Sequence, residues 1–270
     1  MDGTDIKTGA GHRILELHYS AMSASNDQPR HSLSPPRQRM PRMPAVTNTK
    51  LFGGAVTADI PSLFIDASQF RQVPDNQEVL LDTSGKEDRS IIIEILERVP
   101  ENDNNAAKAH FDALAHDNEA EDNAQVLSVV PCSTEEIPHL PNNVSAYILT
   151  GTQQVVKFYP RRRGSEDLVS TGHALSPAPF VVILLALIRL PQQETDIVIS
   201  MNIDFIDMDD MLSVACLGVP SETGTDTGLT SAFPLSGGTG GATRIEKARR
   251  ELKAILSSFV IQDWGLFGGQ

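Results

Sequence analysis

Polar and apolar residues alternate along much of the chain between residues 55 and 203, as they do in β-strands with one buried face. A Gly53-Gly54 turn precedes the first of these stretches, and residues 62–70 form an irregular or short helical link to the second. β-branched residues are frequent in these stretches and favour sheet. We therefore predict strands over residues 55–60, 77–82, 90–99, 125–130 and 145–159, with Gly151 as the position where the last one would break.

Residues 181–190 and 196–203 form two further apolar stretches that are separated by the polar turn PQQET. In the second stretch Ser200 and Asn202 point to one face of a strand, and the opposite face is apolar. The apolar face consists of Ile197, Ile199, Met201 and Ile203. Leucine and alanine prefer helix, so periodicity alone leaves a helix open for the LLALI segment.

Two segments instead have apolar residues at helical spacing. The first is residues 104–116, where Ala107, Phe111 and Leu114 share a face. The second begins at Thr243, which has capping-box spacing to Glu246. Its apolar face consists of Ile245, Ala248, Leu252, Leu256 and Phe259. The closing FVIQDWGLFG segment is expected to lay Trp264 and Phe267 back onto the core. Antiparallel strands together with helices predict an α/β sandwich.

Two segments, one before the first predicted strand and one after the last, differ in composition from the rest of the chain. Residues 1–49 are rich in serine, proline and arginine without periodicity, which predicts a disordered tail. Residues 207–241 end in SETGTDTG and SGGTGG, which predict a flexible insertion. The remaining chain, residues 50–270, is expected to form a single domain around that insertion.

Charge is distributed unevenly along the chain, which carries a formal net charge of −13. The tail has a balance of +2 and the domain a balance of −15. An acidic domain is a poor nucleic-acid binder, because phosphate contacts need lysine and arginine. It suits a basic protein face, or it serves only solubility. The longest apolar run, residues 180–188, ends at Arg189 and is far shorter than the ~20 residues of a membrane helix, so no membrane partner is expected.

The sequence contains no arrangement typical of catalysis, a cofactor or a metal ion. The segment SGGTGGAT lacks the lysine of a phosphate-binding loop. His110 and His116 are six residues apart and are interpreted as surface histidines. Cys132 and Cys216 are the only cysteines, which excludes a disulfide framework. Residues 161–163 are three arginines, interpreted as a solvated loop or a weak nuclear localisation signal.

The hydrophilic segment RQVPDNQEV lies between two apolar stretches. Val73-Pro74 favours an extended or turning backbone, and Asp75 with Asn76 turns the chain. Asp75 and Glu78 then lie at a strand entrance, where carboxylates suit recognition of a basic partner. The alternative is an ordinary polar turn with solvated charges. In both cases the pair is expected to contribute little to stability.

Four segments resemble the Ran guanine-nucleotide release factors, the Mog family of nuclear-import proteins. They are LFGGAVTADIP, FIDASQFRQVPDNQEV, VVILLALIRLPQQETDIVISMNI and SSFVIQDWGLFG, and they occur in the family's order. The resemblance implies an α/β/α sandwich with a central, mainly antiparallel sheet and a long C-terminal helix, the fold that this family shares with the PsbP proteins of photosystem II. It also favours strand over helix for LLALI.

The resemblance further implies a non-enzymatic binding protein that promotes nucleotide release from the Ran GTPase and supports nuclear import. Ran would be bound in its nucleotide-free or GTP-bound form, and the protein would be a monomer in the nucleus with a cytoplasmic pool. Asp75 and Glu78 match the family's acidic pair in PDxQEV. Asp66 and Arg71 either complete that patch or serve local structure, as a helix cap and its ion-pair partner.

Two other classes of function remain open from the sequence. One is a trafficking adaptor or scaffold with the same fold that does not act on nucleotide exchange. The other is a small-ligand module of the PsbP kind, which the lack of an organellar targeting signal disfavours.

Overall fold

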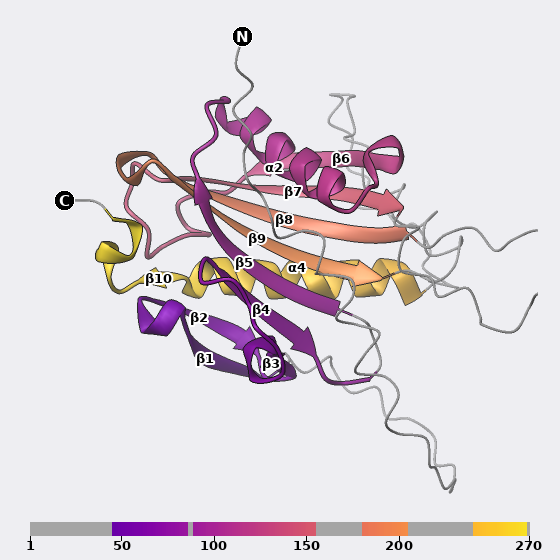
Figure 1. Cartoon of the computed structure of the whole chain (residues 1–270), viewed down its shortest axis with the longest axis horizontal. Coiled ribbons are helices and arrows are strands. Elements are labelled where there is room, and N and C mark those ends of the chain that lie inside the picture. The colour runs from indigo at the N-terminus through magenta and orange to yellow at the C-terminus, as the bar shows by residue number, and fades with distance from the viewer. Residues whose placement is uncertain (1–44, 86–88, 155–179, 205–239, 269–270) are drawn as a thin grey trace, which may run out of the picture.

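The computed structural model describes residues 45–85, 89–154, 180–204 and 240–268, and Figure 1 shows their arrangement. Most strands of this part belong to a seven-stranded sheet with the order β3-β4-β5-β9-β8-β7-β6, and all neighbours in it are antiparallel. Their bounds are β3 Phe64–Asp66, β4 Gln77–Asp82, β5 Arg89–Glu97, β6 Ala124–Pro131, β7 Ser145–Gln154, β8 Phe180–Leu190 and β9 Thr195–Asp204.

A second, three-stranded antiparallel sheet has the order β1-β2-β10 and joins the two ends of the described chain. Its strands are β1 Val46–Leu51, β2 Val56–Pro61 and β10 Val260–Ile261. The helices and short 3-10 turns are η3 Phe52–Gly54, η4 Ala67–Gln69, α2 Asp103–Asp117, η5 Glu121–Asn123, η6 Pro191–Gln193, α4 Gly240–Ser258 and η7 Trp264–Phe267.

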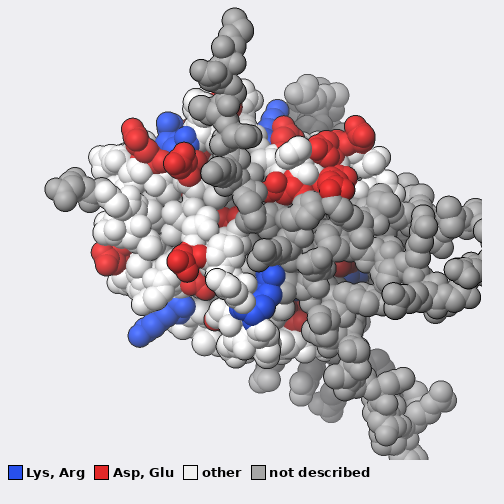
Figure 2. Space-filling model, in the orientation of Figure 1, with Lys and Arg blue, Asp and Glu red and all other residues white. Residues whose placement is uncertain are grey.

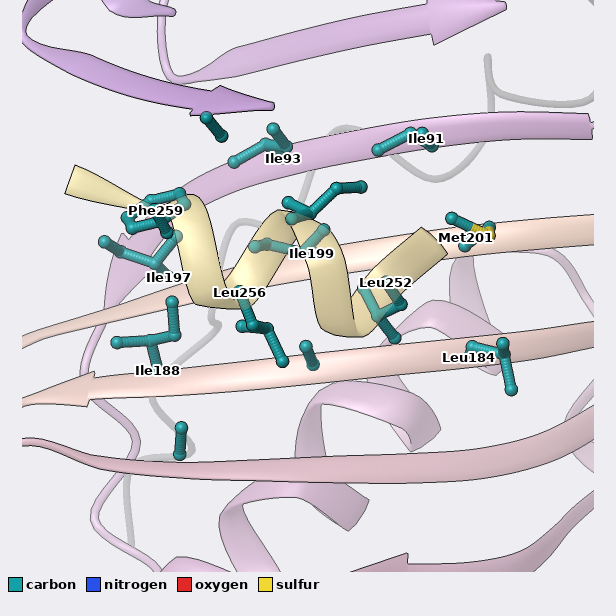
Figure 3. Close-up of a cluster of buried hydrophobic side chains, with 14 of the residues drawn as sticks. Ile91, Ile93, Leu184, Ile188, Ile197, Ile199, Met201, Leu252, Leu256 and Phe259 are labelled. Atoms are coloured by element: carbon teal, nitrogen blue, oxygen red, sulfur yellow. The ribbon is translucent and has the colours of Figure 1, made fainter. Parts of the chain in front are cut away.

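Helices α2 and α4 pack on opposite faces of the large sheet (Figure 1). Helix α4 also packs against β2, so the small sheet and α4 together cover one face. Figure 3 shows the core on this side, where Leu252 and Leu256 of α4, and Phe259 directly after the helix, meet the isoleucines of β5 and β9. On the other face α2 buries Ala107, Phe111 and Leu114 against β6, β7 and β8. These layers make the predicted α/β sandwich.

Most predicted elements are confirmed within one or two residues. The β8–β9 hairpin excludes a helix for LLALI, and one face of β9 carries the expected apolar residues. Strand β7 continues through Gly151 in unbroken pairing with β8, so the suggested break is wrong. The irregularity at this position lies in β6, whose register to β7 shifts between Val126 and Ser128. The link over residues 62–70 contains a short strand, β3, which pairs with β4.

The predicted domain boundaries are shifted at two places. The tail was predicted to reach residue 49, but Val46 already begins strand β1. The C-terminal helix begins at Gly240, so Thr243 lies inside it and not at its cap, and the last two residues of the predicted insertion belong to α4. The other residues of the predicted tail and insertion, Cys216 and residues 161–163 lie outside the described residues. No helix of the described ranges is long and apolar enough to cross a membrane.

Two buried arginines form ion pairs between strands of the large sheet and the helices that pack on it. Arg89 of β5 pairs with Asp82 of β4 at 2.6 Å and with Glu251 of α4 at 2.5 Å, which links the large sheet to the helix behind it. Its guanidinium also lies 5.3 Å from the centre of the Phe64 ring. Charged groups this deeply buried are compatible with the fold only because each is paired and hydrogen-bonded.

Arg189 of β8 forms a second buried network at the other end of the large sheet from Arg89. It contacts Asp196 of β9 and Asp103 of α2 at 3.1 Å each, and it donates to the carbonyl oxygens of Val99 and Glu101. The second oxygen of Asp196 accepts from the Val99 N–H at 3.1 Å and lies 2.9 Å from His110 Nε2. Burial alone would raise the pKa of Asp196, but these hydrogen bonds and the Arg189 charge lower the pKa overall.

Gly151 is required by close packing and not by its backbone angle. A Cβ atom at this position would lie 2.6 Å from two ring carbons of Phe111 and 3.0 Å from the Gln125 carbonyl oxygen. We expect Gly151→Ala to lower the free energy of unfolding by about 1–3 kcal/mol, because the buried ring or the strand must move. Chemical denaturation measures this loss.

A double-mutant cycle with Phe111→Leu provides the control for Gly151→Ala. The smaller side chain makes room for the new methyl group, so the two losses should sum to more than the loss in the double variant. Strict additivity would contradict a steric cause at the Phe111 ring.

Candidate partner-binding site

The segment between η4 and β4 forms a closed turn at one end of the large sheet. The Gln77 N–H donates to the Pro74 carbonyl at 3.0 Å, and the Ile95 N–H donates to the Asn76 carbonyl at 2.9 Å. These bonds attach the turn to β5. Asp75 lies at the exposed tip of the turn, and its side chain is available to a partner.

Glu78 follows as the second residue of β4 and is half-buried. Glu78 pairs with Ile93 of β5, and Leu80, two residues further along β4, pairs with Asp66 of β3. Because side chains alternate along a strand, Glu78 and Asp66 lie on the same face as Leu80, the face that packs towards α4. The structure therefore brings Glu78 and Asp66 together, as the sequence predicts for a patch.

The Glu78 carboxylate is held by the glycine turn of residues 52–54. Its Oε1 accepts a hydrogen bond from the backbone N–H of Phe52. Phe52 has a φ of 50°, in the left-handed region, and Gly53 and Gly54 follow with φ values of 66° and 100°. Such a conformation is costly for a phenylalanine and is concentrated at functional sites. The hydrogen bond fixes one oxygen of Glu78 and so orients the carboxylate.

Burial raises the pKa of Glu78, the Phe52 N–H opposes this effect, and the nearby Asp66 charge adds to it. The ionised form is therefore less well solvated than that of an ordinary surface glutamate. A carboxylate in this state gains more from a cationic partner than a fully hydrated one does.

The roles of Asp66 and Arg71 differ from one another. Asp66 caps η4 by accepting from the Ser68 N–H at 2.7 Å, as the local alternative predicts, and its charge also reaches Glu78. Arg71 is half-buried and lies two residues after η4, where its backbone N–H donates to the Ala67 carbonyl oxygen at 3.1 Å.

The C-terminal segment lies against the other side of the glycine turn. The N–H groups of Gln262 and Asp263 both donate to the Ala55 carbonyl, at 2.8 and 3.1 Å. Phe267 packs on the core as predicted, but Trp264 stays 36% exposed, so the prediction for Trp264 is wrong. Figure 1 shows η7, the start of β2 and the start of β4 at the same end of the molecule. Sequence reasoning had not linked these segments.

The family model described as Ran-interacting Mog1 protein matches residues 49–204, more than half of the chain. The chain belongs to the Mog1 family. This confirms the resemblance drawn from the four sequence segments.

The alignments of this Mog1-family chain with named relatives cover most of the length of each relative. The Ran guanine nucleotide release factor of Danio rerio is 38% identical over 56% of this chain and 75% of that protein. The probable ran guanine nucleotide release factor of Dictyostelium discoideum is 28% identical over 81% of this chain and 94% of that protein. The crystal structure of the Saccharomyces cerevisiae Ran-binding protein Mog1p, 24% identical, aligns with a TM-score of 0.56 over 83% of this chain and 98% of that one. It confirms the fold.

Other candidate groups of the Mog1-family chain have structural roles. His110 is buried beside Asp196, so its interpretation as a surface residue is wrong, whereas His116 is exposed and pairs with Glu121 at 2.6 Å. Burial, followed by the Glu136 charge, raises the pKa of the Cys132 thiol to about 11, which disfavours a reactive thiolate. In the described ranges no group of His, Cys, Asp and Glu side chains is arranged to hold a metal ion.

Acidic groups predominate over basic ones among the described residues on the side of the Mog1-family domain seen in Figure 2. This agrees with the acidic balance of the sequence. A surface of this kind attracts a basic partner over distances of about a Debye length, roughly 8 Å at physiological salt.

The raised pKa of Glu78 predicts a pH-dependent effect of Glu78→Gln. The folded state binds the Glu78 proton more tightly than the unfolded state, so this contribution to stability is present at low pH and is lost as pH rises through the folded pKa. Glutamine keeps an acceptor for the Phe52 N–H but cannot ionise. We therefore expect the stability of the variant, relative to wild type, to increase as pH rises from about 4 through the folded pKa of Glu78.

Urea denaturation of both proteins across this range measures that difference. The same change at Glu97, the exposed last residue of β5, serves as the control, since the Glu97 side chain is open to solvent in the folded protein. A Glu78→Gln difference that does not change with pH would contradict the burial of the Glu78 charge.

Proposed function

We propose that this chain binds the Ran GTPase, promotes release of its guanine nucleotide and thereby supports nuclear protein import. Family membership and the names of the relatives support this proposal. The observation that carries it at residue level is the Glu78 carboxylate, which the strained Phe52 turn orients beside Asp66 and next to the exposed Asp75. Such a preoriented acidic surface suits a basic face of a GTPase.

The proposed mechanism is binding linkage and requires no covalent step. If the protein binds nucleotide-free Ran more tightly than nucleotide-bound Ran, it must weaken nucleotide binding by the same factor. A nucleotide bound with nanomolar affinity is stabilised by about 12 kcal/mol, so the protein must supply strong substitute contacts. We propose that it acts in this way as a monomer, in the nucleus and with a cytoplasmic pool.

Asp75 and Glu78 are the proposed source of these contacts, with Asp66 and Arg71 beside them. A phosphate-binding lysine of the GTPase normally pairs with the nucleotide phosphates. Glu78 would compete for that lysine through the carboxylate oxygen that Phe52 does not hold. The nucleotide would then lose a cationic contact while the lysine keeps an anionic partner.

Calorimetric titration of this protein with nucleotide-free, GDP-bound and GTP-bound Ran tests the proposal. We expect binding, with the highest affinity for the nucleotide-free form. Equal affinity for all three forms would overturn nucleotide release and would instead indicate an adaptor. The absence of binding to every form would overturn the proposed function altogether.

A further inference from the structure

The glycine turn that holds Glu78 is also the attachment point of the C-terminal segment. On one side the Phe52 N–H donates to Glu78, and on the other side Ala55 accepts from the N–H groups of Gln262 and Asp263. Within the turn the Ala55 N–H donates to the Phe52 carbonyl at 3.2 Å. A continuous set of hydrogen bonds therefore connects the acidic site with η7.

The geometry of η7 presents its tryptophan to solvent in a fixed position. Asp263 caps η7 by accepting from the Gly265 N–H at 2.8 Å, and β10 anchors the preceding residues by pairing with β2. Leu266 and Phe267 pack on the core, whereas Trp264 stays exposed with its ring 6.0 Å from the Phe267 ring. Trp264 thus has a rigid support on one side and open surface on the other.

We propose that Trp264 is an apolar anchor of the same partner-binding surface as Glu78 and Asp75. The proposal rests on the proposed function, and its occupant is an apolar or aliphatic patch of the GTPase next to the basic group that Glu78 engages. Tryptophan is among the residues most often found as energetic hot spots of interfaces. An apolar contact beside the carboxylates also excludes water, which strengthens the ion pairs next to it.

A role as an interface anchor gives a reason for the exposure of the Trp264 ring, which the packing of the domain does not require. Truncating Trp264 would remove a partly exposed ring and its contact with Phe267, so the effect on stability should be small. In an interface the same truncation removes a buried aromatic group, so the effect on affinity should be large. These two readouts separate an anchor from a residue with only a structural role.

Trp264 is the only tryptophan of the chain, which gives a direct probe. We would replace it by fluorotryptophan in the full-length protein and record fluorine NMR spectra while adding unlabelled, nucleotide-free Ran. The single resonance is expected to shift and broaden on binding. The Trp264→Ala variant should bind Ran about tenfold or more weakly, with little change in its melting temperature.

The matched control is Leu63→Ala, which truncates another exposed apolar residue, 51% accessible. Leu63 comes after the last residue of β2, whereas η3 and the glycine turn precede its first residue. The affinity of this variant should equal that of wild type. If wild type binds Ran while the fluorine resonance stays unchanged and Trp264→Ala keeps its affinity, the anchor proposal is overturned and the proposed function stands. If wild type does not bind Ran, both are overturned.

Discussion

Replacing Asp196 by alanine is expected to lower the free energy of unfolding by about 3–5 kcal/mol, a large part of the stability of an ordinary domain. Asp196 is fully buried and accepts from Arg189, from the Val99 N–H and from His110. Alanine would leave the Arg189 guanidinium buried without its fully buried counter-charge, because the remaining carboxylate, Asp103, is partly exposed. Equilibrium denaturation at neutral pH measures the loss.

Two variants test the cause of this loss. Asp196→Asn keeps the shape and part of the hydrogen bonding, so it should cost less than alanine. Arg189→Met combined with Asp196→Ala should cost less than the sum of the single changes, because the second change removes the charge that the first leaves unpaired. A loss below about 1 kcal/mol for Asp196→Ala would contradict the importance of this network, since surface substitutions alone reach about 0.5 kcal/mol.

Reversing both charges of the acidic pair, Asp75→Lys with Glu78→Lys, is expected to weaken Ran binding by about a thousandfold or more. Like charges placed against a basic partner face cost several kcal/mol, and each 1.4 kcal/mol is about tenfold in affinity. Binding of wild type should also weaken as salt increases, because exposed charges are screened. Calorimetry at two salt concentrations measures both effects.

The structure changes the expected stability of this double variant. The sequence predicted that the pair matters little for stability, but Glu78 is half-buried and accepts from the Phe52 N–H. We now expect Glu78→Lys to lower the free energy of unfolding by about 1–3 kcal/mol, since it leaves that donor without its acceptor. Asp75→Lys alone, at an exposed position, should leave stability unchanged while still weakening binding.

The matched control is the pair Asp112→Lys and Asp122→Lys, which makes the same change in net charge at two exposed acidic residues. Asp112 lies on α2, and Asp122 lies in η5 at the opposite end of the large sheet. This variant should retain most of the affinity of wild type. A similar loss in both double variants would show that only total charge matters and would remove the claim for Asp75 and Glu78.

Strands that form the centre of the sheet could be predicted from the sequence because both of their faces are buried. The run from Val181 to Leu190 has no exposed residue, and its length and turn are typical of a hairpin. Strand β1 was missed for the opposite reason. Only Leu51 of its six residues is buried, so VTNTKL has no apolar face, and its pairing with β2 is what makes it a strand.

His110 shows a signal that was present in the sequence but was not used. It lies three residues after Ala107 and four before Leu114, on the apolar face of the predicted helix. Its partner could not be predicted, because Asp196 is 86 residues away in the sequence. The network of Arg189 depends on the same long-range placement.

The acidic site was partly predictable. The Pro-Asp-Asn turn and the resumed alternation placed Asp75 and Glu78 at the entrance of a strand, and the structure places them there. The hydrogen bond from Phe52 joins residues 26 apart and depends on a left-handed phenylalanine, which local propensity does not favour. The contact of the C-terminal segment with the same turn spans the whole domain and is visible only in the fold.

The most direct test of the central claim is the rate at which Ran releases a bound fluorescent guanine nucleotide. Wild-type protein should accelerate the release in proportion to its concentration until it saturates. The Asp75→Lys, Glu78→Lys variant should leave the rate at its basal value, and the Asp112→Lys, Asp122→Lys variant should accelerate release as wild type does. A basal rate with wild type, or full acceleration by the variant with the reversed acidic pair, would contradict the account.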